Sequence, residues 1–281
     1  MPSHFEIDAE PSVVVADDSV IVVRKPGRMH TAPLPRPESR GPESRESLCD
    51  WVFARFPDAA TAVDAGRRRP AAEAGLIHRL DYETSGLVLF ARTSASLSAL
   101  LAQQDSGMIA KEYLARTAPS EGFFPEGSRP LRWAPVGIEP SGWEAALREA
   151  GLGDAVPAAG LLEVSRAKGA LPSIESRFRP YGPGSRRVAC LDPGLKAPAA
   201  ATSESYLSWL VGSLAIGGQL EFRVRLVSGF RHQVRAQLAW IGFPILGDPL
   251  YGGLESGRLH LHAARLEFRH PGSGESLVLE D

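Results

Sequence analysis

The segment GLIHRLDYETSGLVLFART, from Gly75 to Thr93, carries the side chains in this sequence that are best suited to acid, base or nucleophile chemistry. His78, Arg79 and Asp81 stand together between two apolar runs that are typical of buried strands. A buried charge without a partner costs several kcal/mol, so we expect a cation to face Asp81. The alternative is that the aspartate only caps the tight turn that Thr84-Ser85-Gly86 predicts.

The segment FRHQVRAQLAW supplies candidates for that cation at the predicted start of a helix. Arg231, His232 and Arg235 cluster there, and the two arginines share a helix face because they are four residues apart. A carboxylate that is paired with an arginine among apolar side chains stays ionised at neutral pH. Asp81 would then be poised to act as a nucleophile or as a base. The alternative is that Arg235 is an ordinary arginine on a helix surface.

The hydrophobic patterns predict strands and helices without regular alternation, which indicates an α+β fold with a mostly antiparallel, mixed β-sheet and flanking helices. We expect a single domain over residues 1–281, with an insertion or lid at about 118–160 that contains a short helix near 143–149. The other expected elements are two strands within 11–30 that meet at Asp17-Asp18, an exposed loop at 31–47, a helix at 48–56, a loop at 57–74, a helix at 94–107 that stops at Gly107, a strand at 109–118, a strand at 218–229, a helix at 231–242 that stops at Gly242 and a strand at 258–271.

The charge of the whole chain gives no sign of a nucleic-acid partner, since 31 Lys and Arg stand against 33 Asp and Glu. Two segments are nevertheless basic. Residues 161–190 hold six bases and two acids, and residues 221–235 hold four arginines and one glutamate. Such segments can follow a phosphate backbone even on a neutral protein, although a solvated surface would have the same composition.

The composition disfavours several classes of protein. No run of about eighteen apolar residues occurs, and the first ten residues are not typical of a signal peptide. Cys49 and Cys190 are too few for a disulfide framework, so we expect a reduced, cytoplasmic protein without a membrane span. His232, His260 and His262 could suggest a metal site. No carboxylate or thiol follows them at ligand spacing, so no metal is expected.

The motif HRLDYETSG closely resembles the HRLD-x-x-TSG signature of the RluA-type pseudouridine synthases, enzymes that isomerise uridine in RNA to its C-glycoside. Other blocks of this family follow in the same order, so the resemblance runs from about residue 11 to the C-terminus and is weakest at 118–160. These blocks are DDSVIVVRKPGRMHTAP, IAKEYLART, VSGFRHQVRAQLAWIGFPILGDPLYGG and RLHLHAARLEFRHPGSGE.

The resemblance implies the pseudouridine synthase catalytic fold and a role for each matching residue. Asp81 matches the catalytic aspartate, which either attacks the ribose C1′ or removes a C2′ proton. Tyr113 matches the tyrosine that stacks near the target base and assists deprotonation at C5, and Arg235 matches the arginine that pairs with the aspartate. Arg79 resembles a group that helps to extrude the base from the RNA. The other residues of these motifs that we expect to contact RNA are His78, Lys111, Arg231, His232 and Gln233.

The resemblance further implies an RNA substrate, ribosomal or transfer RNA, and no cofactor, because the uracil is detached, rotated and rejoined in place. We expect a monomer without the S4-type RNA-binding domain of many relatives. Two residues depart from the family pattern, namely Phe230 in place of an arginine and Gln237 in place of a histidine. Two other functions stay open, a catalytically silent RNA-binding protein of the same fold and a hydrolase that uses Asp81 with a histidine.

Overall fold

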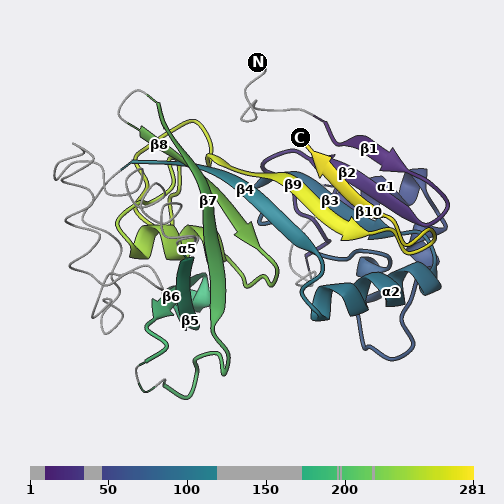
Figure 1. The fold of residues 1–281 in the computed structure, drawn as a ribbon, viewed down its shortest axis with the longest axis horizontal. Coiled ribbons are helices and arrows are strands. Elements are labelled where there is room, and N and C mark those ends of the chain that lie inside the picture. The colour runs from purple at the N-terminus through teal and green to yellow at the C-terminus, as the bar shows by residue number, and fades with distance from the viewer. Residues whose placement is uncertain (1–9, 35–45, 119–172, 195, 197, 217–218) are drawn as a thin grey trace, which may run out of the picture. The chain divides into compact units, whose positions relative to one another are not determined.

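The structure, a computed structural model, describes residues 10–34, 46–118, 173–194, 196, 198–216 and 219–281. The chain divides into two compact units, the first formed by Met1–Lys111 with Leu261–Asp281 and the second by Glu112–His260 (Figure 1). The predicted insertion at 118–160 and its short helix lie outside the described residues, apart from Ala118. No helix in the described ranges is long and apolar enough to cross a membrane.

The first unit is built on a mixed sheet that carries the Asp81 motif. Its strands lie in the order β1 (Ser12–Ala16), β2 (Val20–Lys25), β3 (Ser85–Ala91) and β9 (Leu261–Arg269), and β10 (Ser276–Glu280) pairs with β9. β3 and β9 are parallel, whereas β1–β2, β2–β3 and β9–β10 are antiparallel. A Cβ on Gly86 would lie 2.4 Å from the backbone oxygen of Ala263, so this close pairing of β3 with β9 requires glycine. The predicted α+β class is confirmed.

Two helices of the first unit begin where the sequence predicts. α1 (Leu48–Arg55) starts with a capping box in which Ser47 and Asp50 bond each other's backbone, and α2 (Ser94–Asp105) starts at Thr93. Gly107 follows α2 with a φ of +70°, in agreement with the predicted stop. Two short 3-10 turns, η1 (Ala59–Thr61) and η2 (Ala71–Glu73), lie within the predicted loop 57–74.

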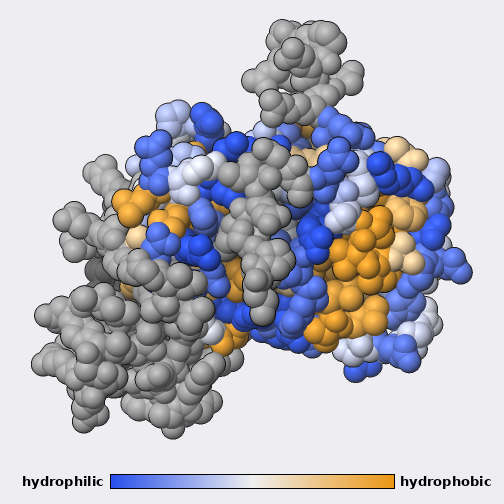
Figure 2. All heavy atoms as spheres, turned by 90° about the horizontal axis from the view of Figure 1, so that it is seen from above, coloured by the Kyte–Doolittle hydropathy of each residue, from blue (hydrophilic) through white to orange (hydrophobic). Residues whose placement is uncertain are grey.

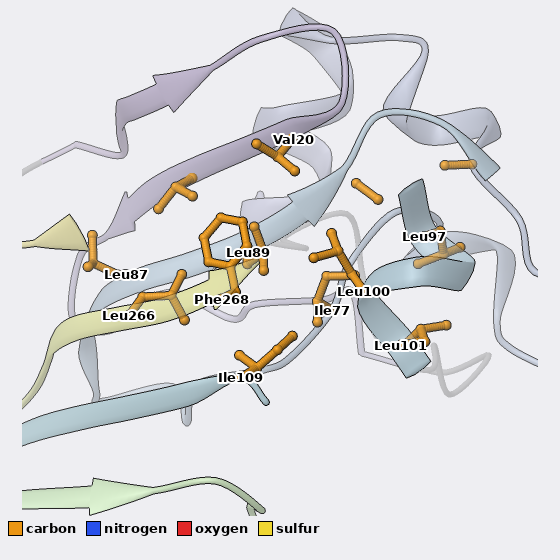
Figure 3. Packing of buried hydrophobic residues seen from close by; sticks show 13 residues of the cluster. Val20, Ile77, Leu87, Leu89, Leu97, Leu100, Leu101, Ile109, Leu266 and Phe268 are labelled. Atoms are coloured by element: carbon orange, nitrogen blue, oxygen red, sulfur yellow. The ribbon is translucent and has the colours of Figure 1, made fainter. Parts of the chain in front are cut away.

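The core of the first unit explains why these elements form. Leucines of α2, including Leu97 and Leu100, gather against Leu89 of β3 and Phe268 of β9 (Figure 3). Each fully buried side chain of this kind contributes about 1.5–3 kcal/mol. Ile77, from the apolar run before the polar cluster, belongs to the same core. The core therefore fixes both sides of the Asp81 motif.

The predicted exposed loop at 31–47 is confirmed only in part at its described ends, where Pro33, Leu34 and Glu46 are exposed. Thr31 and Ala32 are buried, and Ser47 is buried as the cap of α1. Their polar and small side chains gave no hydrophobic pattern. The hydroxyl of Thr31 bonds to the backbone of Leu80, and the hydroxyl of Ser47 caps α1.

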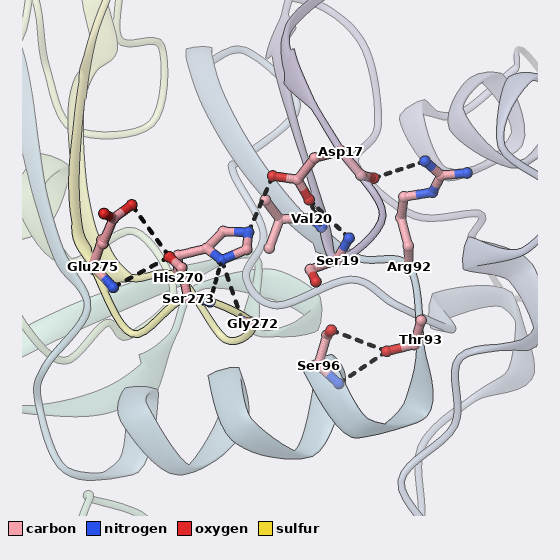
Figure 4. Close-up of polar contacts among 10 residues, drawn as sticks. All are labelled: Asp17, Ser19, Val20, Arg92, Thr93, Ser96, His270, Gly272, Ser273 and Glu275. Atoms are coloured by element: carbon pink, nitrogen blue, oxygen red, sulfur yellow. Dashed lines mark hydrogen bonds and ion pairs between the residues drawn. The ribbon is translucent and has the colours of Figure 1, made fainter.

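A polar contact between two turns closes the first unit (Figure 4). His270 Nδ1 accepts hydrogen bonds from the backbone of Gly272 and Ser273, so His270 Nε2 carries the proton and donates to Asp17 at 3.0 Å. Arg92 also donates to the backbone oxygen of Asp17. These contacts join the β1–β2 turn to the β9–β10 turn and to the start of α2.

Apolar side chains remain exposed on the edge strands of the first unit. Val13 of β1 is 43% exposed and Val278 of β10 is 46% exposed. Figure 2 shows hydrophobic side chains gathered on the face seen from above, on the side of the view where these strands lie in Figure 1. Apolar side chains cannot neutralise phosphates, so we place this surface outside the candidate RNA interface.

The second unit is a sheet that packs against one buried helix. Its strands lie in the order β4 (Ala110–Thr117), β8 (Gln219–Leu226), β7 (Tyr206–Ile216), β5 (Ser173–Tyr181) and β6 (Arg187–Leu191), and β4 begins in the first unit. The turn η3 (Pro183–Ser185) joins β5 to β6. All eight residues of α5 (Gln233–Trp240) are buried, and Gly242 follows with a positive φ as predicted.

The two departures from the family pattern both pack within this unit. Phe230 stacks on Phe178 with ring centroids 4.8 Å apart and also contacts Tyr206. Gln237 is fully buried, and its amide donates to Ser176 Oγ at 3.0 Å and to the backbone oxygen of Tyr206 at 2.9 Å. Both residues therefore hold α5 and its approach to β5 and β7.

Candidate active site

Asp81 lies in an irregular segment directly before β3, where it is partly buried. Its backbone oxygen accepts from Thr84 N at 3.1 Å, so the turn after the polar cluster lies at Tyr82-Glu83 and not at Thr84-Ser85-Gly86, where β3 already begins at Ser85. The backbone oxygen of the next residue, Tyr82, accepts from Met29 N at 3.1 Å. Lys25, which is fully buried, directs its ammonium at the backbone oxygens of Pro26, Met29 and Tyr82, at 2.8, 2.8 and 3.4 Å. The Lys-Pro-Gly turn is thereby tied to the segment that carries Asp81.

His78 and Lys111 form a buried basic pair in the first unit. Burial and the charge of Lys111 lower the pKa of His78 to about 3, so its imidazole is neutral at pH 7. Its Nε2 accepts from Leu89 N at 3.4 Å. Burial lowers the pKa of Lys111 to about 8, and no carboxylate among the described residues offsets this desolvation. An ammonium buried in this way is unusual and points to a functional role.

Arg79 points away from the core, in contrast to its neighbours. Its side chain is 59% exposed and forms an ion pair with Glu73 of η2. The motif was expected to place His78, Arg79 and Asp81 next to the core. His78 is buried and Asp81 is partly buried, but Arg79 is exposed. An exposed ion pair contributes about 0–1 kcal/mol, so Arg79 can leave Glu73 at little cost.

Arg235 is held in the second unit by a carboxylate that the sequence reasoning missed. Its Nε and Nη2 donate to the two oxygens of Asp248 at 2.7 and 2.8 Å, and both side chains are almost completely buried. The ring of Tyr251 lies 5.5 Å from the guanidinium. A Cβ on Gly247 would lie 1.7 Å from the backbone oxygen of Arg258, so only glycine fits directly before Asp248. Asp248 lies in the block GDPLYGG, which is part of the resemblance and could have marked it as a site residue.

The residues that precede Arg235 do not lie together on a helix face. α5 starts at Gln233, so Arg231 is outside the helix, and its guanidinium donates to the backbone oxygens of Ser185 and Arg187. His232 has a φ of +57° at the helix start and its Nδ1 lies 3.1 Å from the hydroxyl of Tyr251. The predicted shared face of Arg231 and Arg235 is therefore wrong, because the helix begins two residues later than the pattern indicates.

Gln233 has its polar atoms engaged inside the second unit. Its side chain is buried, it accepts from Phe230 N at 3.0 Å, and it donates to the backbone oxygen of Leu207 at 3.0 Å. This arrangement gives Gln233 a packing role at the start of α5. Tyr113 lies on β4 and is also buried, at 7% exposure.

The basic segment 221–235 is largely neutralised by carboxylates from elsewhere in the second unit. Glu112 is buried on β4 and pairs with Arg225 at 2.9 Å and with Arg223 at 3.5 Å. Asp248 pairs with Arg235 in the same way. The surplus of positive charge counted along the sequence is thus mostly removed in the fold.

The histidines of the chain have separate partners. Ser85 Oγ lies 2.9 Å from His262 Nδ1, and His262 Nε2 lies 3.3 Å from an oxygen of Asp281. These residue types resemble a hydrolase triad. Ser85 and His262 are nevertheless buried and lie opposite each other where β3 pairs with β9, so they join the two strands. His260 contacts Ser256 instead. Within the described ranges, no group of three or more His, Cys, Asp or Glu could hold a metal ion.

The site residues thus fall into two sets. His78, Arg79, Asp81 and Lys111 belong to the first unit, whereas Tyr113, Arg231, His232, Gln233 and Arg235 belong to the second. A pairing of Asp81 with Arg235 stays a prediction, and Asp248 is the partner described for Arg235.

Comparison with known proteins relates these sets to one family. A family model described as RNA pseudouridylate synthase matches residues 19–147, a range that includes Asp81 and Tyr113. The dual-specificity RNA pseudouridine synthase RluA of Escherichia coli is 26% identical, over 99% of this chain and 96% of that protein. The chain is thus similar to RNA pseudouridine synthases of the RluA type.

Other relatives of this chain are longer. An RNA pseudouridine synthase of Chloroflexus aurantiacus is 29% identical over 89% of the chain, and ribosomal large subunit pseudouridine synthase D of Xanthomonas campestris is 28% identical over 96% of it. The chain spans 58% and 65% of the lengths of these two proteins. The solved structure of human RNA pseudouridylate synthase domain containing 1 covers 97% of this chain and 83% of its own, with a TM-score of 0.56 and 17% identity. That likeness supports the fold.

Proposed function

We propose that this chain isomerises a uridine of structured RNA to pseudouridine, with Asp81 as the group that acts at the ribose. The observation that carries the proposal is the position of Asp81 in the matched family region, on a backbone segment held by Lys25, Met29 and Thr84. Fixed backbone contacts hold a reacting group in one geometry, which is a large part of catalysis. Ribosomal and transfer RNA are the proposed substrates, and a cytoplasmic monomer is the proposed form.

The proposed reaction breaks the bond between N1 of uracil and the ribose C1′ and forms a bond from C5 to C1′. The proton on C5 leaves, and N1 gains a proton, so atoms balance without a cofactor. The target base must first leave its stack, which costs a few kcal/mol. In the proposal Arg79 assists this step, since its weak exposed pair with Glu73 can be exchanged for RNA contacts. Tyr113 recovers part of the cost by stacking on the base.

Arg235 completes the proposed site as the cation for Asp81, and the buried pair with Asp248 supports this role by fixing the guanidinium. An arginine has several donors, so one carboxylate does not exhaust its hydrogen-bonding capacity. His78, Lys111, Arg231 and His232 are proposed to contact the RNA. Gln233 is proposed to act through the packing of α5.

The test is release of tritium from C5-labelled uridine in total RNA from cells that lack this gene. We expect release with the wild-type protein and none with Asp81→Asn, which keeps the side-chain shape but removes the nucleophile or base. Tyr113→Phe keeps the ring but loses the hydroxyl, so release should slow by roughly a hundredfold or more.

The variants also separate the alternative functions. Asp81→Asn should still bind RNA, because phosphate contacts lie elsewhere. A wild-type protein that binds RNA but releases no tritium from any RNA would indicate the silent RNA-binding protein. A hydrolase would release free uracil or cleaved RNA instead, and the low pKa of His78 makes it a poor base for that reaction at pH 7.

A further inference from the structure

The residue before Asp81 is held by the side chain of Thr31, to which the resemblance assigns no role. The hydroxyl of Thr31 donates to the backbone oxygen of Leu80 at 2.8 Å and accepts from the backbone N–H of Leu80 at 3.1 Å. Thr31 and Leu80 are 3% and 7% exposed, so water does not compete for these bonds. One hydroxyl therefore satisfies both polar groups of the residue that precedes the proposed catalytic aspartate.

Thr31 is itself fixed by the start of α1. Its backbone oxygen accepts from Cys49 N at 3.0 Å, and the backbone oxygen of His30 accepts from Leu48 N at 2.8 Å. These N–H groups are among the first of α1, which have no partner within the helix. The connection runs from the buried end of α1 through Thr31 to Leu80, and so bridges 49 positions of the sequence.

We propose that Thr31 is a positioning residue that fixes the backbone on which Asp81 acts. Thr31 bonds to the backbone of Leu80, before Asp81. Met29 and Lys25 bond to the backbone oxygen of Tyr82, after it, and the N–H of Thr84 bonds to the backbone oxygen of Asp81 itself. Three consecutive residues are thus tied to their surroundings. Since a displacement of about 1 Å can cost a hundredfold in rate, loss of one tie affects the reaction more than RNA binding. The kinetic part of this inference rests on the proposed function.

The test compares Thr31→Val with Thr31→Ser and a matched control. Valine has the shape of threonine without the hydroxyl, so the Thr31→Val protein should lose between about tenfold and a hundredfold in kcat with an almost unchanged KM for RNA. Thr31→Ser keeps the hydroxyl and should stay within about threefold of wild type. The control is Thr93→Val, which also removes a hydroxyl with two bonds in the first unit, but at the start of α2 (Figure 4).

A second measurement does not depend on activity. The amide of Leu80 should exchange its hydrogen at least about tenfold faster in Thr31→Val than in wild type, Thr31→Ser or Thr93→Val, because only that variant loses its acceptor. A wild-type kcat together with a protected Leu80 amide in Thr31→Val would overturn the inference. Equal losses of kcat in Thr31→Val and Thr93→Val would also overturn it, since the effect would then follow general stability. If wild type forms no pseudouridine, the proposed function fails and the Leu80 amide still decides the positioning.

Discussion

At the scale of single residues, two buried lysines of the first unit contrast sharply. Lys25 is fully buried and donates to three backbone oxygens, so its charge is well solvated by the protein. Lys111 is 5% exposed, and burial lowers its pKa to about 8 without an offsetting carboxylate among the described residues. We therefore expect Lys25 to stabilise the fold and Lys111 to oppose folding below pH 8. This contrast favours a structural role for Lys25 and a binding role for Lys111.

The expected result of Lys111→Met is therefore a more stable protein. The unfolded pKa of 10.5 lies above the folded pKa of about 8, so the wild-type ammonium opposes folding in full below pH 8. At pH 7 the variant should gain on the order of 3 kcal/mol in the free energy of unfolding. The gain should shrink as the pH rises from 8 to 10.5, because the folded wild type has already lost the proton. Urea unfolding across this pH range measures it.

Lys25→Met is the control for this experiment, because it removes an equally buried ammonium that has acceptors. It should lower the free energy of unfolding at every pH in the range. RNA affinity should fall in Lys111→Met despite the added stability, as is common where a binding group is costly to the fold. A Lys111→Met protein that is less stable than wild type at pH 7 would show that this ammonium has a good partner.

The residues of the site could be predicted from sequence only where a motif or a local turn defines them. A turn after the polar cluster was expected from adjacent residues, but it lies at Tyr82-Glu83, two residues before the predicted position. The contacts of Thr31 and Asp248 were not predicted, although both residues lie in blocks of the resemblance, since their bonds to Leu80 and Arg235 join residues 49 and 13 positions apart. Long-range hydrogen bonds of single polar residues leave no periodic pattern.

At the scale of elements, the second unit is centred on α5, whose Arg235 pairs with the carboxylate of Asp248. The bidentate pair of Arg235 with Asp248 is buried on all sides, and the hydroxyl of Tyr251 accepts from Val188 N while its ring lies near the arginine. Removal of one member of such a pair leaves an uncompensated charge, whereas replacement of both members by apolar groups is often tolerated. Stability and catalysis can therefore be separated at this pair.

The corresponding prediction is a double-mutant cycle. Arg235→Met alone should lower the free energy of unfolding by about 3–5 kcal/mol, since Asp248 then loses its cation in the core. The double variant Arg235→Met/Asp248→Leu should recover much of this loss, because no buried charge is left alone. It should still release no tritium if the arginine serves Asp81. A double variant as unstable as the single one would mean that Asp248 is not the main partner of Arg235.

The elements that the sequence predicted were largely found, but β5, β6, β7 and β10 were not predicted. The helices at Leu48–Arg55 and Ser94–Asp105 and the strands β4, β8 and β9 follow hydrophobic patterns with clear caps or glycine stops. Errors arose where the pattern was weak. α5 starts at Gln233 because His232 adopts a left-handed conformation, which the sequence RHQV does not signal. All of α5 is buried, so it lacks the polar face that would have marked its boundary.

At the scale of the whole molecule, the distribution of charge decides where RNA can bind. The chain has a net charge of −2, and the two basic segments looked equivalent in sequence. In the fold, Arg223 and Arg225 are paired with Glu112, which lies more than a hundred residues earlier. Arg177 donates to the backbone oxygen of Pro193, and Arg179 lies over the ring of Tyr181. The backbone contact of Arg177 leaves its positive charge in place, so the β5–β6 hairpin is our candidate for phosphate binding.

The salt dependence of RNA binding tests this difference. Each phosphate contact contributes roughly 0.7–0.9 to the slope of log affinity against log salt. The variant Arg177→Ala/Arg179→Ala should bind RNA more weakly and reduce the magnitude of the slope by about 1–2. Arg223→Ala/Arg225→Ala should change it less, because those arginines already have a carboxylate. Glu112→Gln removes that carboxylate and should steepen the slope. Equal effects of the two double variants, or a slope that Glu112→Gln leaves unchanged, would show that pairing within the fold does not select the RNA-binding surface.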